Sequence, residues 1–137
     1  MKHLKTIEEY IKDKDESIDD LIEFNWHYMS KFILLTELFM EKYQDKLNWN
    51  LISAYQILSE PFIDKHKDKV NWRHITQYQI IDEPFMLTYK HKVYWYHIFK
   101  NNQLSHSTLI LLIGHTFINK YTKQLYLQQL HRPKDFK

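Results

Sequence analysis

The fold is decided by residues 48–85, which read NWNLISAYQILSEPFIDKHKDKVNWRHITQYQIIDEPF. This stretch is one unit written twice, because Trp49 and Trp72 stand 23 residues apart and the residues around them match. The same step taken outward reaches Trp26 and Trp95, and these four are all the tryptophans of the chain. A fixed period of this size is typical of a repeat array, in which each unit buries its apolar face on its neighbours.

Positions within a unit are numbered here from its tryptophan, which is position 0. The residue before it is Asn25, Asn48 or Asn71 in the first three units, and Asn is a good helix N-cap. Residues at positions +3, +6 and +9, which are mostly apolar or aromatic, follow the tryptophan. This spacing predicts one buried stripe on a helix that begins at the tryptophan.

A second N-cap type, Ser, Thr or Asp, stands at position +10 of every unit, and Glu-Pro follows it in the two middle units. Proline is tolerated in the first turn of a helix but disfavours helix at the residue before it. We therefore expect the first helix to end near Leu58 and near Ile81, and a second short helix to follow. A lysine-rich turn then ends that helix, where cations suit the helix dipole.

Helices of roughly eight to ten residues are marginal alone in water, so the units must be stabilised by stacking. We predict an all-α protein of short helix–turn–helix repeats of 23 residues, stacked as a small solenoid or a compact helical bundle with N- and C-terminal capping helices. The Trp residues, with the Phe at position +13, are expected to form the core between the helices.

The chain is expected to be a single domain over residues 1–137. Thr6 and Glu9 form a capping box, which predicts a helix from Thr6 to about Lys14. Around the repeats we expect an N-terminal cap (1–24), the repeat units (25–107), a C-terminal cap helix (108–130) and a flexible tail (131–137).

The composition excludes several classes of protein. Hydrophobic residues make up 44% and aromatic residues 16%, which is too apolar for a disordered chain. One Gly and three Pro favour helices over a sheet with many turns, and the absence of Cys excludes disulfides and thiolate metal sites. The longest apolar run, residues 109–113, is far short of the roughly 20 residues that span a bilayer, so no membrane partner is expected.

The net charge of +2 hides an asymmetry. Residues 1–85 carry 16 acidic and 11 basic side chains, a balance of −5, whereas residues 86–137 carry 1 and 8, a balance of +7. A stack would therefore be acidic at one end and basic at the other. That polarity permits head-to-tail self-association between an acidic N-terminal end and a basic C-terminal end.

The sequence holds few candidates for a catalytic or metal-binding site. His74 and His97 occupy the same position in successive units, so stacking would bring them near each other. No two histidines stand four residues apart, however, and a structural zinc site needs four converging ligands. A single Gly cannot build a phosphate-binding loop. We predict surface histidines, no catalytic residues, no cofactor, no metal and no enzymatic activity.

The middle units resemble a repeat of giant DNA virus, phage and bacterial proteins, with the pattern K-V-N-W-x-x-I-S-x-Y-Q-x-L-S-E-x-F-I. The match covers residues 45–98 and fades at both ends. The resemblance implies a helical repeat, a viral or phage origin and a location in the host cytoplasm, and it implies no particular activity. The residues that carry it in the third unit are Val70-Asn71-Trp72, Ile75-Thr76, Tyr78-Gln79 and Glu83-Pro84-Phe85.

Two binding functions remain. The first is a protein-interaction module that binds a host or defence-system protein, and inhibits or recruits it, because small solenoids present long rigid surfaces. Its contact residues would be the variable positions, which are Asn50, Arg73 and Tyr96 at +1 and Ala54, Gln77 and Lys100 at +5.

The alternative is nucleic-acid binding by the basic, aromatic C-terminal half. Residues 90–100 interleave cations with aromatic side chains, which suits phosphate contact and base stacking. In that case Lys90, Lys92 and Lys100 would contact the nucleic acid.

Overall fold

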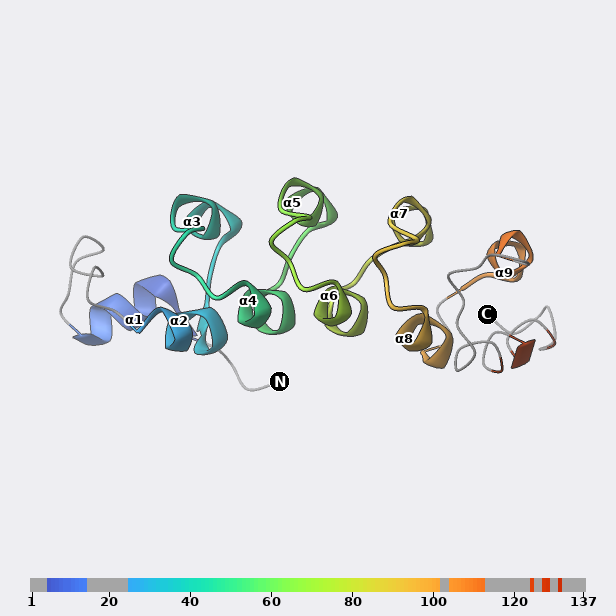
Figure 1. The fold of residues 1–137 in the computed structure, drawn as a ribbon. Helices are drawn as coiled ribbons and strands as arrows, with labels where there is room; N and C mark the ends of the chain where they lie inside the picture. Colours follow the sequence, from blue (N-terminus) through green and yellow to red (C-terminus); the bar gives the residue numbers. More distant parts are fainter. Residues whose placement is uncertain are drawn as a thin grey trace.

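The computed structural model of this protein describes residues 5–14, 25–101 and 104–112 and the isolated residues 124, 127, 128 and 131. Between residues 25 and 112 it is a stack of short helices in two layers (Figure 1). The first helices of the four units form one layer, and they are α2 (Trp26–Phe32), α4 (Trp49–Tyr55), α6 (Trp72–Tyr78) and α8 (Trp95–Lys100). The second helices form the other, and they are α3 (Glu37–Lys42), α5 (Glu60–Lys65), α7 (Glu83–Thr88) and α9 (His106–Leu111).

This architecture confirms the predicted all-α fold of stacked helix–turn–helix repeats. Of the two arrangements left open by the sequence, the described units adopt the solenoid, since the helices follow one another along a row (Figure 1). Neighbouring first helices pack directly on one another: α2 on α4, α4 on α6, and α6 on α8.

The predicted helix starts are confirmed by their capping bonds. The Asn48 side chain accepts a hydrogen bond from the Leu51 N–H at 3.2 Å, and Asn25 and Asn71 make the same bond in their units. The side chain at position +10 accepts from the N–H three residues on in all four second helices. α8 is the exception among the first helices, since Tyr94 makes no side-chain cap bond.

The predicted ends of the first helices were wrong by three residues. α4 ends at Tyr55 and α6 at Tyr78, and the next residue is extended, with φ −90° and ψ 157° at Gln56. The reason lies in the following unit, whose glutamine at position +7 binds the backbone of the connector, the extended segment between the two helices of a unit. Gln56 does this for the connector after α2. The Gln56 amide donates to the Ser30 and Ile33 carbonyls at 3.0 and 2.7 Å, and its oxygen accepts from the Leu35 N–H at 2.9 Å.

Gln79 makes the equivalent three bonds one unit later. The glutamine at position +7 therefore pairs with one N–H and two carbonyls of the preceding unit. The connector of that unit no longer needs hydrogen bonds within a helix for these groups. Backbone groups that are buried must be paired, so the side chain and the extended connector stabilise each other.

A buried hydroxyl at position +4 links the first helices. Ser53 donates to the Trp49 carbonyl at 2.7 Å and accepts from the Asn71 N–H at 2.9 Å, and Ser30 and Thr76 repeat this pair of bonds. These side chains are small, so neighbouring first helices approach closely. In the fourth unit the position is Phe99, which is buried.

The core lies between the two layers. Position +3, which is Met29, Ile52, Ile75 or Ile98, is fully buried in every unit. The Trp residues pack against this core, as predicted: Trp49 stacks on Phe62 with ring centroids 6.1 Å apart, and the same pair recurs in the units before and after.

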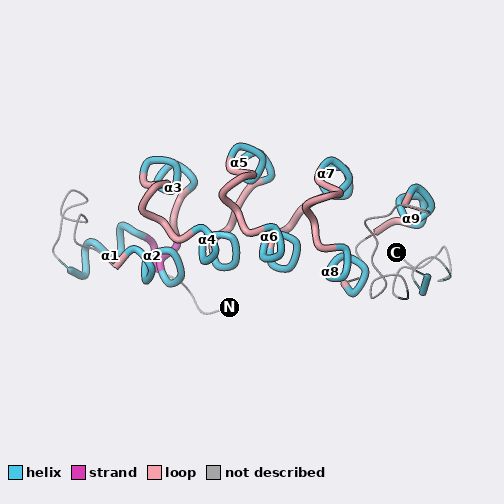
Figure 2. Tube along the Cα trace, viewed as in Figure 1, coloured by secondary structure: helices cyan, strands magenta, loops and turns pink. Residues whose placement is uncertain are grey.

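The N-terminal segment closes the first unit. The predicted capping box is confirmed, with Glu9 bound to the Thr6 N–H at 2.9 Å and α1 running over Ile7–Lys14. A parallel strand pair, β1 (Lys5–Thr6) with β2 (Ile33–Leu34), was not predicted (Figure 2). β2 lies in the connector between α2 and α3 of the first unit. β1 therefore pairs with the backbone of the connector at the N-terminal end of the stack.

The C-terminal part is described only to Leu112 and at four isolated positions. The predicted C-terminal cap, residues 108–130, begins within α9, and most of it lies outside the described residues. Residues 132–137 of the tail and residues 1–4 and 15–24 of the N-terminal cap also lie outside them. Among the helices that the structure describes, none is long and apolar enough to cross a membrane.

Candidate binding surface on the first-helix layer

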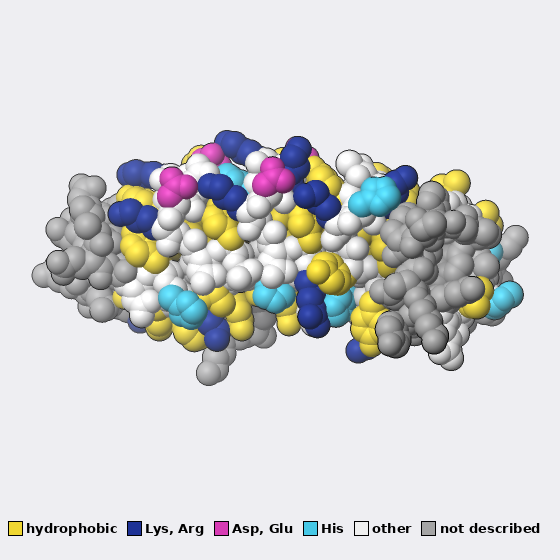
Figure 3. All heavy atoms as spheres, in the orientation of Figure 1, with side chains coloured by type: hydrophobic (Ala, Val, Ile, Leu, Met, Phe, Trp, Pro, Cys, Tyr) yellow, Lys and Arg dark blue, Asp and Glu magenta, His cyan; other side chains and the backbone are white. Residues whose placement is uncertain are grey.

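Acidic side chains are confined to one layer of the stack. The segments from position −1 to +9, residues 25–35, 48–58, 71–81 and 94–104, contain no Asp or Glu. The eight carboxylates between residues 25 and 101 all lie at the start of a second helix, within it, or in the turn that follows: Glu37, Glu41, Asp45, Glu60, Asp64, Asp68, Asp82 and Glu83. On the face drawn in Figure 3, the acidic side chains follow the edge formed by the second helices.

The glutamates that begin the second helices are engaged by the next unit. Glu37 accepts from the Ser59 N–H at 2.6 Å and from its hydroxyl at 3.0 Å. Glu60 accepts from the Asp82 N–H at 2.6 Å, and Glu83 binds Ser105 in the same way. These carboxylates therefore hold the stack together and are not free for a ligand.

A polar pocket of about 340 Å³ lies between α3 and α5. Glu41 in its wall is bound by Lys65 at 2.8 Å and by His66 at 2.7 Å, and these two hydrogen bonds lower the pKa of Glu41. The lining residues are Glu41, Gln44, Lys65, His66, Asp68 and Lys69.

The same contact recurs one unit later with different chemistry. There the Tyr89 hydroxyl donates to Asp64, and this bond raises the pKa of Tyr89 to about 12. His66 is buried against Trp49 and Phe62, as Tyr89 is packed against its own unit's rings. Since His66 and Glu41 fill a repeated contact between units, the pocket is part of the scaffold.

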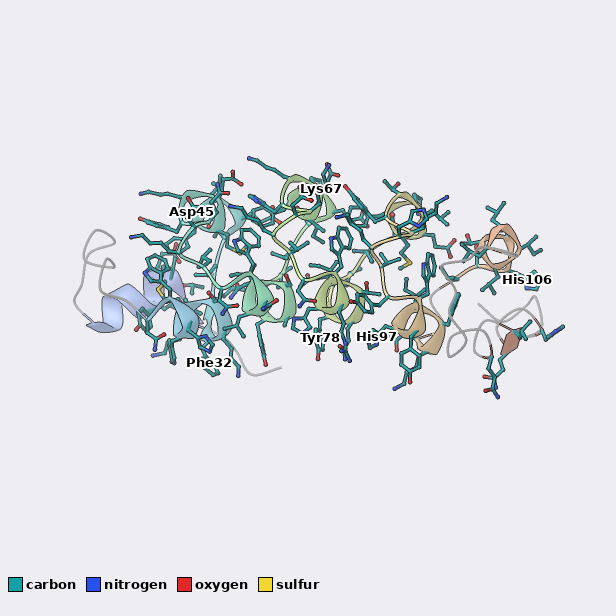
Figure 4. All side chains as sticks on the ribbon, viewed as in Figure 1. Phe32, Asp45, Lys67, Tyr78, His97 and His106 are labelled. Atoms are coloured by element: carbon teal, nitrogen blue, oxygen red, sulfur yellow. The ribbon has the colours of Figure 1, made fainter. Side chains whose placement is uncertain are left out.

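The outer side of the first helices is different. We call the first-helix surface the residues at positions +1, +2, +5 and +6 of the four units. They are His27, Tyr28, Lys31, Phe32, Asn50, Leu51, Ala54, Tyr55, Arg73, His74, Gln77, Tyr78, Tyr96, His97, Lys100 and Asn101. Figure 4 shows Phe32, Tyr78 and His97 along one long edge of the stack and Asp45 and Lys67 along the opposite edge.

Three aromatic rings repeat along this surface at position +6. Phe32, Tyr55 and Tyr78 are 44, 46 and 56% exposed. The prediction that position +6 lies on the buried stripe was therefore wrong. The buried side is centred by positions 0, +3 and +4, and at about 100° per residue position +6 lies roughly 120° from the tryptophan. The polar-looking Ser or Thr at +4 belongs to the core, and that is what turns the aromatic ring outward.

Two exposed aliphatic side chains, Ile57 and Ile80, follow Tyr55 and Tyr78 by two residues in the sequence. Ile57 is 72% exposed and Ile80 is 95% exposed. Each stands in an extended connector between two inward-pointing residues, Gln56 and Leu58 in the second unit, and alternation of this kind is a property of extended chain.

Two cations of this surface lie close to aromatic rings. Lys31 Nζ lies 5.1 Å from the ring centroids of both Phe32 and Tyr55, and Lys100 Nζ lies 5.8 Å from that of Tyr96. Burial lowers the pKa of His97, and the positive charges of Arg73 and Lys100 lower it further. Within the described residues no ion pair involves Lys31, Arg73 or Lys100.

The predicted contact residues lie in two different parts of the structure. Arg73, Gln77, Tyr96 and Lys100 all lie exposed on the first-helix surface. Lys90 and Lys92 belong to the turn after α7, the equivalent of the turn that holds Lys67 at the opposite edge (Figure 4). Lys92 also lies over the Trp72 ring, at 5.9 Å, and 3.7 Å from Asp68.

The residues missed by sequence reasoning are Lys31 and the aromatic row at position +6. The angular position of +6 on a helix would have identified that row, provided that the +4 hydroxyl was counted as buried.

His74 bonds to the Asn50 carbonyl at 3.0 Å. In the part of the chain that the structure describes, no group of three His, Asp or Glu side chains is placed to hold a metal ion.

No protein-family model, no curated protein and no solved structure matches this chain. The surface itself is therefore the basis for a functional conclusion. It offers exposed rings, aliphatic groups and positive charge along a rigid stack, and this chemistry suits binding.

Proposed function

We propose that this protein is a non-enzymatic protein-interaction module that binds its partner on the first-helix surface. The observation that carries the proposal is the row of half-exposed rings of Phe32, Tyr55 and Tyr78, with Lys31 close to the first two rings and no Asp or Glu in the first-helix segments. Tyr and Arg are enriched among residues that dominate protein–protein binding energy. Exposed apolar groups gathered on one surface mark such sites in soluble proteins.

The partner is expected to be acidic where it meets this surface. Uncompensated Lys31, Arg73 and Lys100 would attract a negative partner and repel a positive one. With the resemblance to viral and phage repeats, we propose that this partner is a host or defence protein that is inhibited or recruited in the host cytoplasm.

Nucleic acid is a second candidate, because the same surface combines cations with rings on which bases can stack. Ile57 and Ile80 favour the protein partner, since aliphatic side chains add little to base stacking. Residues 90–100 do not form one basic patch, because Lys90 and Lys92 lie in the turn after α7 and Lys100 lies on the first-helix surface. This run therefore favours neither partner.

A pull-down with the full chain from native host extract tests the proposal, with and without nuclease. We expect one stoichiometric protein partner that survives nuclease and is lost when Arg73→Glu and Lys100→Glu are combined. The matched control combines Lys67→Glu and Lys90→Glu, which changes the net charge equally at the opposite edge, and it should retain the partner.

Retention of the partner by the Arg73→Glu/Lys100→Glu variant would place binding elsewhere and contradict the proposal. Recovery that disappears with nuclease would favour the nucleic-acid function.

A further inference from the structure

Neighbouring first helices meet at their positions +1 and +2. The His74 ring bonds to the Asn50 carbonyl at 3.0 Å, and the Asn71 side chain donates to the Asn50 side chain at 2.9 Å. Position +2 of one unit therefore touches position +1 of the unit before. Because α8 packs on α6 as α6 packs on α4, the same register places His97 beside Arg73.

Lys100 joins these two residues from α8. It stands three residues after His97, and side chains at that separation are neighbours on a helix. Burial lowers the pKa of His97, and the positive charges of Arg73 and Lys100 lower it further, as nearby like charges do. Figure 3 shows Lys or Arg and His side chains together along its lower edge, over α6 and α8. We call Arg73, His97 and Lys100 the cationic cluster.

The cationic cluster occurs at one of the three junctions between first helices. Its members stand at position +1 of one unit and at positions +2 and +5 of the next. At the junction of α4 and α6 these positions hold Asn50, His74 and Gln77, and at the junction of α2 and α4 they hold no Lys or Arg. Two junctions thus form without the charges, so stacking does not require them.

The charge of the cluster is not balanced by the chain around it. Among the described residues, neither Arg73 nor Lys100 forms an ion pair. The first-helix segments contain no Asp or Glu, and residues 86–137 contain one acidic residue, Asp135. Like charges that lie close together repel one another, and a bound anion relieves that repulsion.

A phosphate monoester matches the cluster in charge and in shape. It carries a charge of about −1.5 to −2 at neutral pH and has three acceptor oxygens. The planar fork of Arg binds two phosphate oxygens, and Lys binds as a point charge. A carboxylate has two oxygens and one negative charge, which leaves one of the two permanent cations uncompensated. The phosphodiesters of nucleic acids carry one charge each and repeat along the strand, whereas the cluster occurs once.

We infer that Arg73, His97 and Lys100 bind a single phosphate monoester group carried by the protein partner. This inference rests on the proposed function and specifies the partner's chemistry. The Arg73 guanidinium and the Lys100 ammonium donate to the phosphate oxygens. His97 takes up a proton from solvent as the phosphate binds, because a nearby negative charge raises the pKa of an imidazole, and it then becomes a third donor.

NMR of the histidine rings of the full chain tests the site. The probe is the blocked peptide acetyl-Gly-phosphoserine-Gly-amide, and acetyl-Gly-Asp-Gly-amide is the single-carboxylate control. We expect saturable binding of the probe, at least about tenfold weaker binding of the control, and a higher pKa of His97 in the bound state. His74 occupies the same position without two cations beside it, so its ring signals should not respond.

Single substitutions test each cation. Arg73→Gln and Lys100→Gln should each weaken binding of the probe at least about tenfold, because each removes a charge-assisted hydrogen bond. Lys31→Gln removes the same charge from α2 on the same surface and should leave the affinity unchanged. Absence of a His97 response overturns the inference, and so does equal affinity for the Asp peptide or in the Arg73→Gln variant.

Phosphatase treatment of the host extract before the pull-down tests the source of the phosphate. The partner should be lost after treatment and retained when the phosphatase is inhibited. A partner that survives phosphatase but is lost from the Arg73→Glu/Lys100→Glu variant overturns the inference and leaves the proposed function standing. If the probe binds and the partner still survives phosphatase, the site takes a free phosphate compound instead. Tighter binding of a 12-nucleotide oligo(dT) than of the probe would assign the cluster to nucleic acid.

Discussion

At the residue scale, the contact between units depends on single side chains that complete another unit's backbone. Gln56 is almost fully buried and pairs with one N–H and two carbonyls of the preceding connector. No apolar residue can replace those three bonds. With an apolar residue in place of Gln56, the connector would hold unpaired buried backbone groups, each of which costs about 1–3 kcal/mol.

We therefore expect Gln56→Ala to lower the free energy of unfolding by about 2–5 kcal/mol, because water can reach some, but not all, of the three backbone groups that lose their partner. Urea unfolding followed by circular dichroism measures the change. Gln77→Ala is the matched control, since Gln77 is exposed, and it should shift stability by no more than about 0.5 kcal/mol. A loss below about 1 kcal/mol for Gln56→Ala would show that the amide does not hold the connector.

At the scale of the element, each first helix is six or seven residues long and depends on its cap. Three of the four begin with an Asn whose side chain binds an orphan N–H, and short helices need such bonds because few of their N–H groups have helical partners. α8 has Tyr94 at its N-cap position and lacks that bond, and it is the helix next to the point where the repeat pattern fades.

Tyr94→Asn should therefore stabilise the protein by about 1 kcal/mol, the usual worth of an N-cap. Tyr94 is 48% exposed, so little apolar burial is lost, and its backbone bond to Thr76 is unaffected. Asn71→Ala should destabilise by a similar amount. Chemical denaturation of both variants under one condition checks the pair, and a Tyr94→Asn variant no more stable than the parent would contradict the assignment of the missing cap.

At the scale of the whole molecule, each unit contacts its neighbours through the same set of positions. Stability in such a stack is approximately the sum of the units and of the interfaces between them. The three side-chain bonds of position +7, the hydroxyl of position +4 and the glutamate of position +11 all recur in register. Removal of a whole period should therefore leave every remaining interface intact.

Deletion of residues 49–71 joins Asn48 to Trp72, which preserves the cap and places Gln79 against the connector at Leu35. We expect this variant to remain helical and to unfold cooperatively, at a lower denaturant concentration than the parent because one interface is lost. The control deletes residues 49–70 and leaves one extra residue, which shifts every contact, and it should lose cooperative unfolding. Equal behaviour of the two deletions would contradict a register set by side chains.

Much of this fold follows from local patterns. The period, the starts of the first and second helices, the capping box of α1 and the buried position +3 were all predicted, because capping bonds span three residues and apolar side chains repeat at helical spacing. The absence of acidic residues from the first-helix segments is also visible in the sequence. Its use in locating a binding surface depends on knowing which side of each helix faces outward.

Other features were decided only by tertiary structure. The early end of α4, the burial of Ser53, the exposure of Tyr55 and the pairing of β1 with β2 all depend on hydrogen bonds between residues 18 to 28 apart in the chain. A local pattern counts Ser and Gln as polar surface residues. Only the neighbouring unit provides the backbone groups that bury them, and their burial is what turns the aromatic row toward a partner.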